Sequence, residues 1–453
     1  MQHVETEFKF RVPADFVMPS FPQSLGTWDS QPIRNMDATY WDTTDATLLR
    51  WGITMRLRTG GGDDGWHVKI PTSTHEQAGG ISGASVRTEL HRDATTATPP
   101  SDFVELLSAI LQGSEVVAIA RVQTHRVPQV LSGSNDKLIE LVDDHVTLSR
   151  EGRVVEEFRE IEIELLDAKA MAVALDLSEI LRTAGAQASS VSKAANAFGP
   201  AAGKQPDIPL LPAPTKTDLP CDLIRWAFSR SVREIFHAEL TSRITHDSTN
   251  LTRKLIALQR LINALRNWLS QDELEFLNED LEWLIRELSF AAVLARQRER
   301  ALGILESLPD PLDRHEATTA VEQYFVDKGE AARSSVQAAR RSDRYLLIFS
   351  DLINLGRVPA VTPAAYEPIS IWDRISQDPC DQLAIAEHFR DIYKKRSKRI
   401  RKNLVCSDPV IQPTDIVQPI EAEPLIRSIA LSGKVDPAAI FALGLSLGGE
   451  HEA

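Results

Sequence analysis

The sequence predicts an α+β protein in which an antiparallel, β-rich half precedes an all-helical half. Two patterns predict this division: short runs of alternating character occur up to residue 198, and apolar residues recur every three or four positions beyond residue 221. Between them, residues 199–220 contain six prolines. Because proline fixes the backbone and lacks a hydrogen-bond donor, this segment is predicted to be an extended linker between a domain at 1–198 and a domain at 221–453.

The β-rich half begins with a run in which charged and apolar residues alternate. In residues 4–11 every odd position is charged, whereas Val4, Phe8 and Phe10 have the opposite phase, and a strand places these two sets on opposite faces. Similar runs follow, separated by turns such as the glycine-rich residues 60–65, and they span residues 54–58, 66–70, 138–142 and 158–165. Two helices are expected near residues 102–112 and 168–184.

Charged side chains gather on one face of several of these strands. They are Arg56, Arg58, Lys69, Glu160, Glu162 and Glu164. The simplest interpretation is a half-buried sheet with a solvated, charged face. The alternative is a barrel with the charges inside, where carboxylates bind a hard divalent cation and the basic side chains bind phosphate oxygens. Such a lumen suits a metal-bound chain of phosphates.

Further motifs extend this set in a fixed order along the first half. The chain begins with the pattern Glu5-x-Glu7-x-Lys9. It continues with Tyr40-Trp41-Asp42-Thr43, Met55-Arg56-Leu57-Arg58, Lys69, Arg87-Thr88-Glu89, Arg126, Asp143, the strand at 160–164 and Ser192-Lys193. As an ordered set over residues 2–198, these motifs resemble the CYTH family, also called the triphosphate tunnel metalloenzymes.

The resemblance implies an eight-stranded antiparallel β-tunnel with flanking helices, which binds a triphosphate with Mg²⁺ or Mn²⁺ and hydrolyses a phosphoanhydride bond. It implies metal ligands at Glu5, Glu7, Glu162 and Glu164, and a catalytic set that adds Lys9 and Glu160. The implied substrate-binding residues are Lys9, Arg56, Arg58, Lys69, Arg87, Arg126 and Lys193. The general base is left open between a carboxylate of residues 160–164 and metal-bound hydroxide.

The second half has apolar residues at helical spacing throughout. The predicted helices cover residues 251–265, 272–302, 310–328, 329–355 and 382–403, and a proline-rich stretch at 404–425 precedes a short apolar helix at 438–447. This layout resembles a divergent CHAD domain, a helical module associated with polyphosphate binding. The signature helix keeps Arg253, Lys254, Arg260 and Arg266, whereas Thr252, Leu255, Gln259 and Ile262 stand where His or Arg is expected.

One strongly basic segment lies near the end of this half, between residues 390 and 402. Its basic residues are Arg390, Lys394, Lys395, Arg396, Lys398, Arg399, Arg401 and Lys402. On one continuous helix, His388, Lys395, Arg399 and Lys402 would form a stripe. A solvated helix face and a binding site for a polyanion, such as polyphosphate or RNA, are both compatible with this composition.

The whole chain has a net charge of −14, which argues against non-specific binding to duplex DNA. It contains no apolar run of about 18 residues and begins without a secretory signal, so we expect a cytoplasmic protein without a membrane partner. The expected activity is metal-dependent hydrolysis of inorganic triphosphate to pyrophosphate and phosphate. The alternatives are a polyphosphate-binding module with little turnover, hydrolysis of thiamine triphosphate or nucleoside triphosphates, and cyclisation of ATP as by a class IV-type adenylate cyclase.

Overall fold

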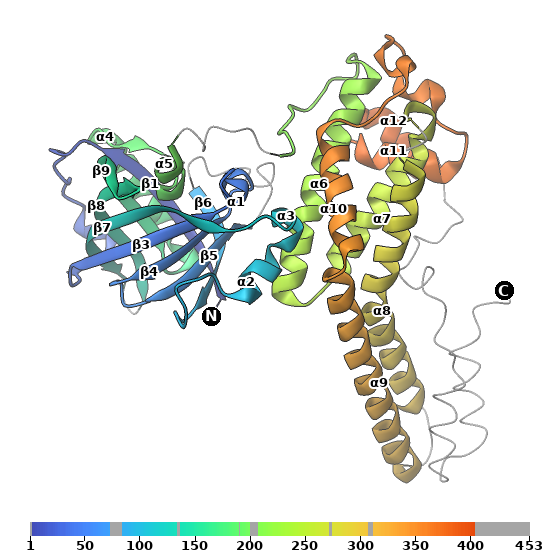
Figure 1. The fold of residues 1–453 in the computed structure, drawn as a ribbon, viewed down its shortest axis with the longest axis horizontal. Helices are drawn as coiled ribbons and strands as arrows, with labels where there is room; N and C mark the ends of the chain where they lie inside the picture. The colour runs from blue at the N-terminus through green and yellow to red at the C-terminus, as the bar shows by residue number, and fades with distance from the viewer. Residues whose placement is uncertain are drawn as a thin grey trace. The chain divides into compact units, whose positions relative to one another are not determined.

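The computed structural model describes residues 2–72, 84–133, 136–189, 191–199, 207–270, 274–306 and 311–403 (Figure 1). The chain divides into two compact units, Met1–Asp207 and Ile208–Ala453, which are considered separately. The proline-rich stretch at 404–425 and the short helix expected at 438–447 lie outside the described residues.

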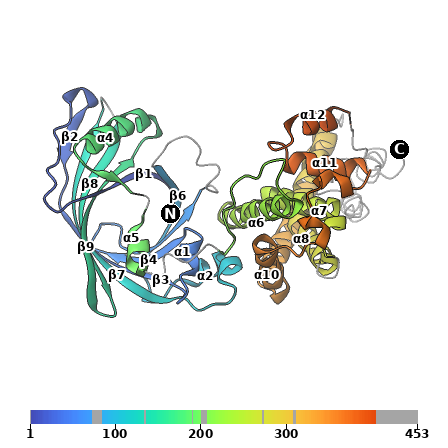
Figure 2. The same cartoon turned by 90° about the horizontal axis from the view of Figure 1, so that it is seen from above.

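The first unit contains a closed barrel of eight antiparallel strands, as predicted. Its strands pair around the ring in the order β1 (Gln2–Val12), β6 (Ala84–Arg92), β5 (Gly65–Pro71), β4 (Thr54–Thr59), β3 (Arg34–Asp42), β7 (Val117–Ser132), β8 (Lys137–Arg150) and β9 (Arg153–Leu165). The ring closes because β9 also pairs with β1 (Figure 2). Two short strands, β2 (Thr27–Ser30) and β10 (Gln187–Ala188), add to β7 and β1 outside this ring.

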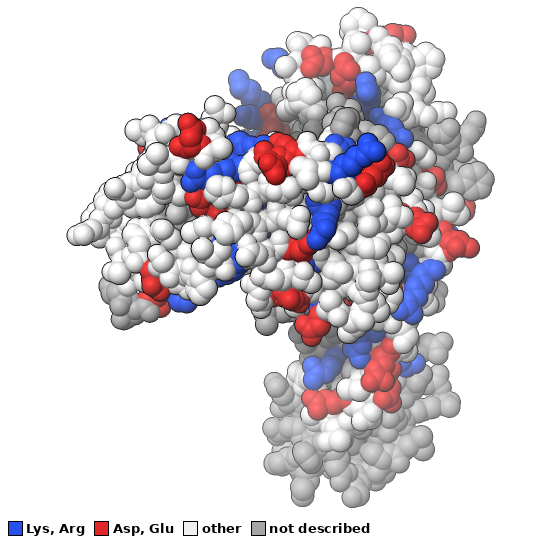
Figure 3. All heavy atoms as spheres, turned by 60° about the vertical axis from the view of Figure 1, so that its left-hand side comes forward, with Lys and Arg blue, Asp and Glu red and all other residues white. Residues whose placement is uncertain are grey.

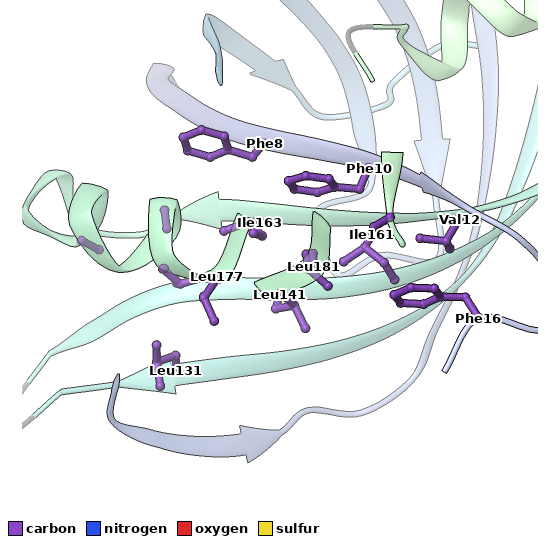
Figure 4. Close-up of a cluster of buried hydrophobic side chains, with 14 residues drawn as sticks. Phe8, Phe10, Val12, Phe16, Leu131, Leu141, Ile161, Ile163, Leu177 and Leu181 are labelled. Atoms are coloured by element: carbon purple, nitrogen blue, oxygen red, sulfur yellow. The ribbon is translucent and has the colours of Figure 1, made fainter. Parts of the chain in front are cut away.

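The apolar phase of β1 and β9 faces outward and forms a buried core. Phe8 and Phe10 lie opposite Ile163 and Ile161 and pack beneath helix α4 (Met171–Thr183), to which Leu177 belongs (Figure 4). Because successive side chains of a strand point to opposite faces, this packing turns the charged phase of both strands into the lumen. The register then places Glu7 opposite Glu164, and Lys9 opposite Glu162.

Short helices complete the first unit. They are α1 (Thr47–Arg50), α2 (Ser101–Leu106), α3 (Ser108–Leu111) and α5 (Lys193–Phe198). The pair of α2 and α3 corresponds to the helix expected near residues 102–112, and α4 corresponds to the helix expected near residues 168–184. Helix α5 packs its alanines and Phe198 against Ala38, Tyr40 and Val122, which belong to the inner phase of β3 and β7. The start of α5 therefore forms part of the wall of the barrel interior.

The second unit is helical, as expected. Its helices are α6 (Pro220–Thr245), α7 (Thr249–Ala264), α8 (Leu274–Glu306), α9 (Pro311–Arg340), α10 (Asp343–Arg357), α11 (Pro379–His388) and α12 (Lys394–Asn403). Helices α8 and α9 pack along each other as a long pair (Figure 1). No helix in the described part of the chain has both the length and the apolar character needed to cross a bilayer.

The division of the chain into helices differs from the sequence prediction at two places. The prediction starts a new helix at Gly329, but this residue lies inside α9, and the break falls at Ser342, whose side chain accepts a hydrogen bond from the Tyr345 amide and starts α10. A single glycine weakens a helix without ending it, whereas an N-cap serine starts one. The predicted helix 382–403 is two helices, so the proposed stripe from His388 to Lys402 is wrong. His388 is partly buried, and its Nδ1 contacts the Ala384 carbonyl.

Candidate active site

The barrel encloses a cavity of about 600 Å³ to which all eight ring strands contribute side chains. Its lining mixes carboxylates and basic groups. The acidic members are Glu5, Glu7, Asp63, Glu89, Glu140, Glu162 and Glu164. The basic members are Lys9, Arg34, Arg56, Arg58, Lys69, Arg87, Arg126 and Lys193. On the outer face drawn in Figure 3, by contrast, acidic and basic side chains are interspersed and form no single large basic patch.

The N-terminal Glu5-x-Glu7-x-Lys9 motif lies on the inner face of β1. Glu5 pairs with Lys69, and Glu7 pairs with Arg87 and, at 3.8 Å, with Lys9. Burial alone would raise the pKa of Glu7, but Lys9 and Arg87 outweigh it and lower the pKa to about 2. The motif therefore supplies two carboxylates that already have cationic partners.

A second acidic group lies on β8 and β9, where Asp144, Glu160 and Glu162 surround the ammonium of Lys193. Lys193 Nζ lies 2.8 Å from Asp144 Oδ2 and 3.1 Å from Glu162 Oε1, and it also contacts Glu160. Arg126 contacts Asp144 and Glu162, each at 2.7 Å. These three acidic residues each offer an oxygen within 4.8 Å of the others, so among the described residues they form the tightest cluster able to hold a metal ion.

This cluster differs in part from the predicted metal set. Glu162 belongs to both, Glu160 lies behind the cavity lining, and Asp144 was not predicted. Asp143, which was placed in the motif series, points to the outer face and pairs with Arg159 at 2.7 Å. The reason is the alternation along β8, which puts Glu140, Val142 and Asp144 on the inner face and Asp143 on the outer one.

Glu164 lies at a point of acidic crowding. Its cross-strand neighbours are Glu7 on β1 and Glu140 on β8. Burial, followed by repulsion from Glu5, raises the pKa of Glu164 to about 7. Glu140 is itself paired with Arg34 at 3.0 Å, a contact that the sequence analysis did not anticipate. A site with this many carboxylates favours an added cation.

The predicted phosphate-binding arginines have unused hydrogen-bonding capacity. The Nε atoms of Arg56, Arg58 and Arg87 are buried and have no hydrogen-bond partner. Arg56 makes a long contact of 3.4 Å to the Tyr40 hydroxyl and an ion pair of 3.7 Å with Glu89, and Arg58 pairs with Asp63 from the hairpin loop. Burial, reinforced by repulsion from Arg56, lowers the pKa of Arg58 to about 9. Buried N–H groups without acceptors favour an incoming anion.

Glu89 is a lumen residue that the predicted site did not include. It lies on β6 two residues after Arg87, on the same face, and its carboxylate meets His67, Lys69 and Arg56. Its place in the lumen could have been predicted from that of Arg87, because residues two apart on a strand share a face. Asp144 lies four residues after Glu140 on the same strand, so the alternation places both on one face.

The donor atoms around the cavity fit a hard divalent cation. They are carboxylate oxygens, which Mg²⁺ and Mn²⁺ prefer over nitrogen or sulfur ligands. The three-carboxylate cluster already accommodates one positive charge, that of the Lys193 ammonium. The identity of the metal is not defined by this donor set.

A closed antiparallel tunnel with carboxylates and basic groups on its inner wall defines the class of this first unit, and residues 3–198 match the family model of the CYTH domain. The match to the CYTH domain covers the strands of the barrel and ends at residue 198, before the helical region. Two uncharacterized proteins of Mycobacterium tuberculosis resemble most of the chain. One, from strain CDC 1551, is 26% identical over 468 residues, and one, from strain H37Rv, is 28% identical over 464; each comparison covers 92% of this chain and 85% of the relative.

Solved structures also resemble the first unit. An adenylate cyclase candidate from Bacillus halodurans is 18% identical, with 44% of this chain and 99% of that chain covered and a TM-score of 0.31. An adenylyl cyclase candidate from Hippeastrum, described as having a dominant triphosphatase activity, is 18% identical, with 46% and 98% covered and a TM-score of 0.26.

Proposed function

We propose that this protein is a metal-dependent hydrolase of inorganic triphosphate, which it converts with water to pyrophosphate and phosphate. The observation that carries the proposal is the cavity wall, where buried arginine N–H groups without acceptors face the same space as seven carboxylates. A phosphate chain with a divalent cation satisfies both sets at once. CYTH proteins as a class act on triphosphates, which supports this choice.

The described lining offers no aromatic platform for an organic group, since Tyr40 is its one aromatic side chain and is buried beside Arg56. This supports inorganic triphosphate over thiamine triphosphate, nucleoside triphosphates or cyclisation of ATP. We place the protein in the cytoplasm, as the sequence predicts.

In the proposed mechanism, Glu5, Glu7, Glu162 and Glu164 hold Mg²⁺ or Mn²⁺. When bound, the metal neutralises phosphate oxygens and polarises the bond to be broken. Arg56, Arg58, Arg87 and the other basic residues of the lining orient the phosphate chain and stabilise the charge that develops on the leaving phosphate. A carboxylate of β9 accepts the proton of the attacking water. No covalent intermediate is required.

The direct test is phosphate release from triphosphate, long-chain polyphosphate and ATP, each with Mg²⁺, Mn²⁺ or a chelator. We expect triphosphate to be the best substrate and its turnover to stop in chelator. Release from ATP alone, or no release with any metal, would contradict the proposal.

The variant Glu162→Gln should reduce triphosphate turnover by at least about a hundredfold, because it removes a charge from the centre of the site. Glu157→Gln is the matched control, since Glu157 lies on the same strand and is exposed. Equal rates in both variants would remove Glu162 from the site. Circular dichroism spectra of both proteins would check that the barrel is intact.

A second candidate function, capture of polyphosphate, is supported by helix α12. All its basic side chains from Lys394 to Lys402 are exposed, while Ser397 and Ile400 are buried, so one face of the helix is almost entirely cationic. Such a face suits a polyanion and suits a CHAD-like role for the second unit.

We expect the combined replacement of Lys394, Lys395, Lys398 and Arg399 by Gln to weaken binding of long-chain polyphosphate at least about tenfold at low salt. Triphosphate turnover should change less than about twofold, since these residues belong to the other unit. Filter binding and phosphate release measure the two effects. A similar decrease in polyphosphate binding and in triphosphate turnover would contradict the assignment of separate functions to the two units.

A further inference from the structure

His67 is a buried side chain of the tunnel unit that the proposed mechanism does not use. It lies on β5 with 2% of its surface exposed, on the same strand face as Lys69. Its Nδ1 lies 2.8 Å from Glu89 Oε1, and its Nε2 lies 2.9 Å from the backbone carbonyl of Asp63. The ring thus connects a carboxylate of the cavity with the hairpin loop between β4 and β5.

Glu89 is placed among several cations, and His67 is the nearest of its partners. Glu89 Oε1 lies 3.7 Å from Arg56 Nη2, and Glu89 Oε2 lies 3.5 Å from both Lys69 Nζ and His3 Nε2. The contacts with Arg56 and Lys69 are ion pairs without direct hydrogen bonds. The carboxylate is therefore held toward His67 and away from Arg56 and Lys69.

The protonation of this pair follows from its surroundings. Burial would raise the pKa of Glu89, but the hydrogen bond with His67, together with Lys69 and Arg56, holds it well below its usual range. Burial is also the main cause that lowers the pKa of His67, to about 4, with further contributions from Arg56 and Arg58. Both ring nitrogens face oxygen acceptors, and at neutral pH the ring carries one proton, so only one of the two contacts is a hydrogen bond. The ionised carboxylate is a stronger acceptor than the Asp63 carbonyl. Nδ1–H is therefore the donor to Glu89.

We propose that His67 is a positioning residue, which holds Glu89 against the wall and so keeps Arg56 and Lys69 available for a substrate phosphate. This inference rests on the proposed function, because it assumes that these two cations bind phosphate. Arg56 fits the role, since its Nε is buried without a partner and its contact with Tyr40 is long. Lys69 retains Glu5 as its second carboxylate partner.

The consequence of losing His67 follows from the same distances. Without the Nδ1–H donor, the Glu89 carboxylate has no hydrogen-bond donor on the His67 side, while Arg56 and Lys69 lie within 3.7 Å of it. A shift of less than about 1 Å would turn both ion pairs into direct, charge-assisted hydrogen bonds. Glu89 would then compete with phosphate for Arg56 and Lys69.

The test compares four variants of the full chain, of which Glu89→Gln alone is the reference for the double variant. His67→Leu removes the donor, His67→Asn keeps an N–H near the position of Nδ1, and His67→Leu/Glu89→Gln also removes the competing charge. We expect His67→Leu to raise the KM for triphosphate about tenfold, the effect of one competing ion pair, with kcat changed less than about threefold. His67→Asn should retain a KM close to that of the wild-type protein, and the double variant should match Glu89→Gln alone.

Calorimetric binding of inorganic triphosphate in chelator provides a readout that does not depend on turnover. If the wild-type protein binds triphosphate without hydrolysing it, the proposed function fails, while the dissociation constants of the variants still test the role of His67. An unchanged dissociation constant in His67→Leu, or a loss that Glu89→Gln does not relieve, overturns the inference. Absence of binding by the wild-type protein both in chelator and with Mg²⁺ present overturns both proposals.

Discussion

At the scale of single residues, Glu162 is where three basic side chains of the tunnel converge. Lys9, Arg126 and Lys193 lie 2.8, 2.7 and 3.1 Å from its carboxylate. Burial alone would raise the pKa of Glu162, but these cations hold it well below its usual range. A carboxylate in this environment stays ionised at any physiological pH. Its charge is therefore a fixed part of the site.

His67 predicts a pH dependence of stability. Its pKa is about 4 in the folded protein and about 6.5 in the unfolded chain, so the unfolded chain binds the additional proton between these values. The stability that the neutral ring contributes is complete above pH 6.5 and is lost as the pH falls toward 4, by up to about 3 kcal/mol.

Denaturant unfolding of the wild-type protein and His67→Asn at pH 7.5 and pH 4.5 measures this effect. We expect the variant to lose less stability on acidification than the wild-type protein, because asparagine does not titrate. Equal losses would mean that His67 is not the group responsible.

The alternation of charged and apolar residues along a strand decided which site residues could be predicted. Glu5, Glu7, Lys9 and Glu162 alternate with apolar residues, and the structure places all four in the cavity lining. Asp143 and Asp144 are adjacent and equally acidic, so their composition alone gave no choice between them. Their orientation depends on the register of β8 against β9, which pairs Asp144 with Glu160. The partners of His67 come from β6 and from the loop between β4 and β5, so they were beyond prediction from one chain segment.

At the scale of elements, the helices of the second unit show which sequence signals define boundaries. The predicted helices at 310–328 and 329–355 correspond to α9 and α10 over most of their described residues, but the division at Gly329 was wrong because α9 continues to Arg340. Helical periodicity is local and strong, whereas a helix end depends on capping contacts such as that of Ser342.

Two glycines of these helices should respond oppositely to alanine. A Cβ at Gly329 would meet only the end of the Arg333 side chain, at 3.7 Å, so Gly329→Ala should stabilise α9 by about 0.5–1 kcal/mol. A Cβ at Gly356 in α10 would lie 3.1 Å from both Val232 and Ile208 side-chain atoms, so Gly356→Ala should destabilise the unit by about 1–3 kcal/mol.

Thermal unfolding of the two variants tests this pair of predictions. A higher melting temperature for Gly329→Ala and a lower one for Gly356→Ala are expected. Destabilisation by Gly329→Ala would show that α9 requires the glycine for a reason other than its conformation.

At the scale of the whole molecule, the tunnel has the elements that it needs within the first unit. Its strands close between Gln2 and Leu165, and α5 ends at Phe198. Asp207 belongs to the same unit, where its carboxylate bonds Trp51 Nε1 at 2.9 Å and Arg50 at 3.0 Å. The sequence-based boundary at residue 198, which was set by proline content, leaves this contact out.

We therefore expect a fragment of residues 1–207 to fold alone and to hydrolyse triphosphate at a rate within about threefold of the full chain. A fragment of residues 1–198 should fold less stably, because it lacks the Asp207 contacts with Arg50 and Trp51. Circular dichroism melting and phosphate release distinguish the two fragments. Failure of the 1–207 fragment to fold would show that the barrel depends on the helical unit.

Each of the eight basic side chains of the cavity lining already has a carboxylate partner. An anion that enters by itself must separate these pairs, and it leaves carboxylates without a cationic partner. A cation that enters by itself leaves ammonium and guanidinium groups without an anionic partner. The two together restore neutrality. Cation and anion should therefore strengthen each other's binding to an equal degree, as thermodynamic reciprocity requires.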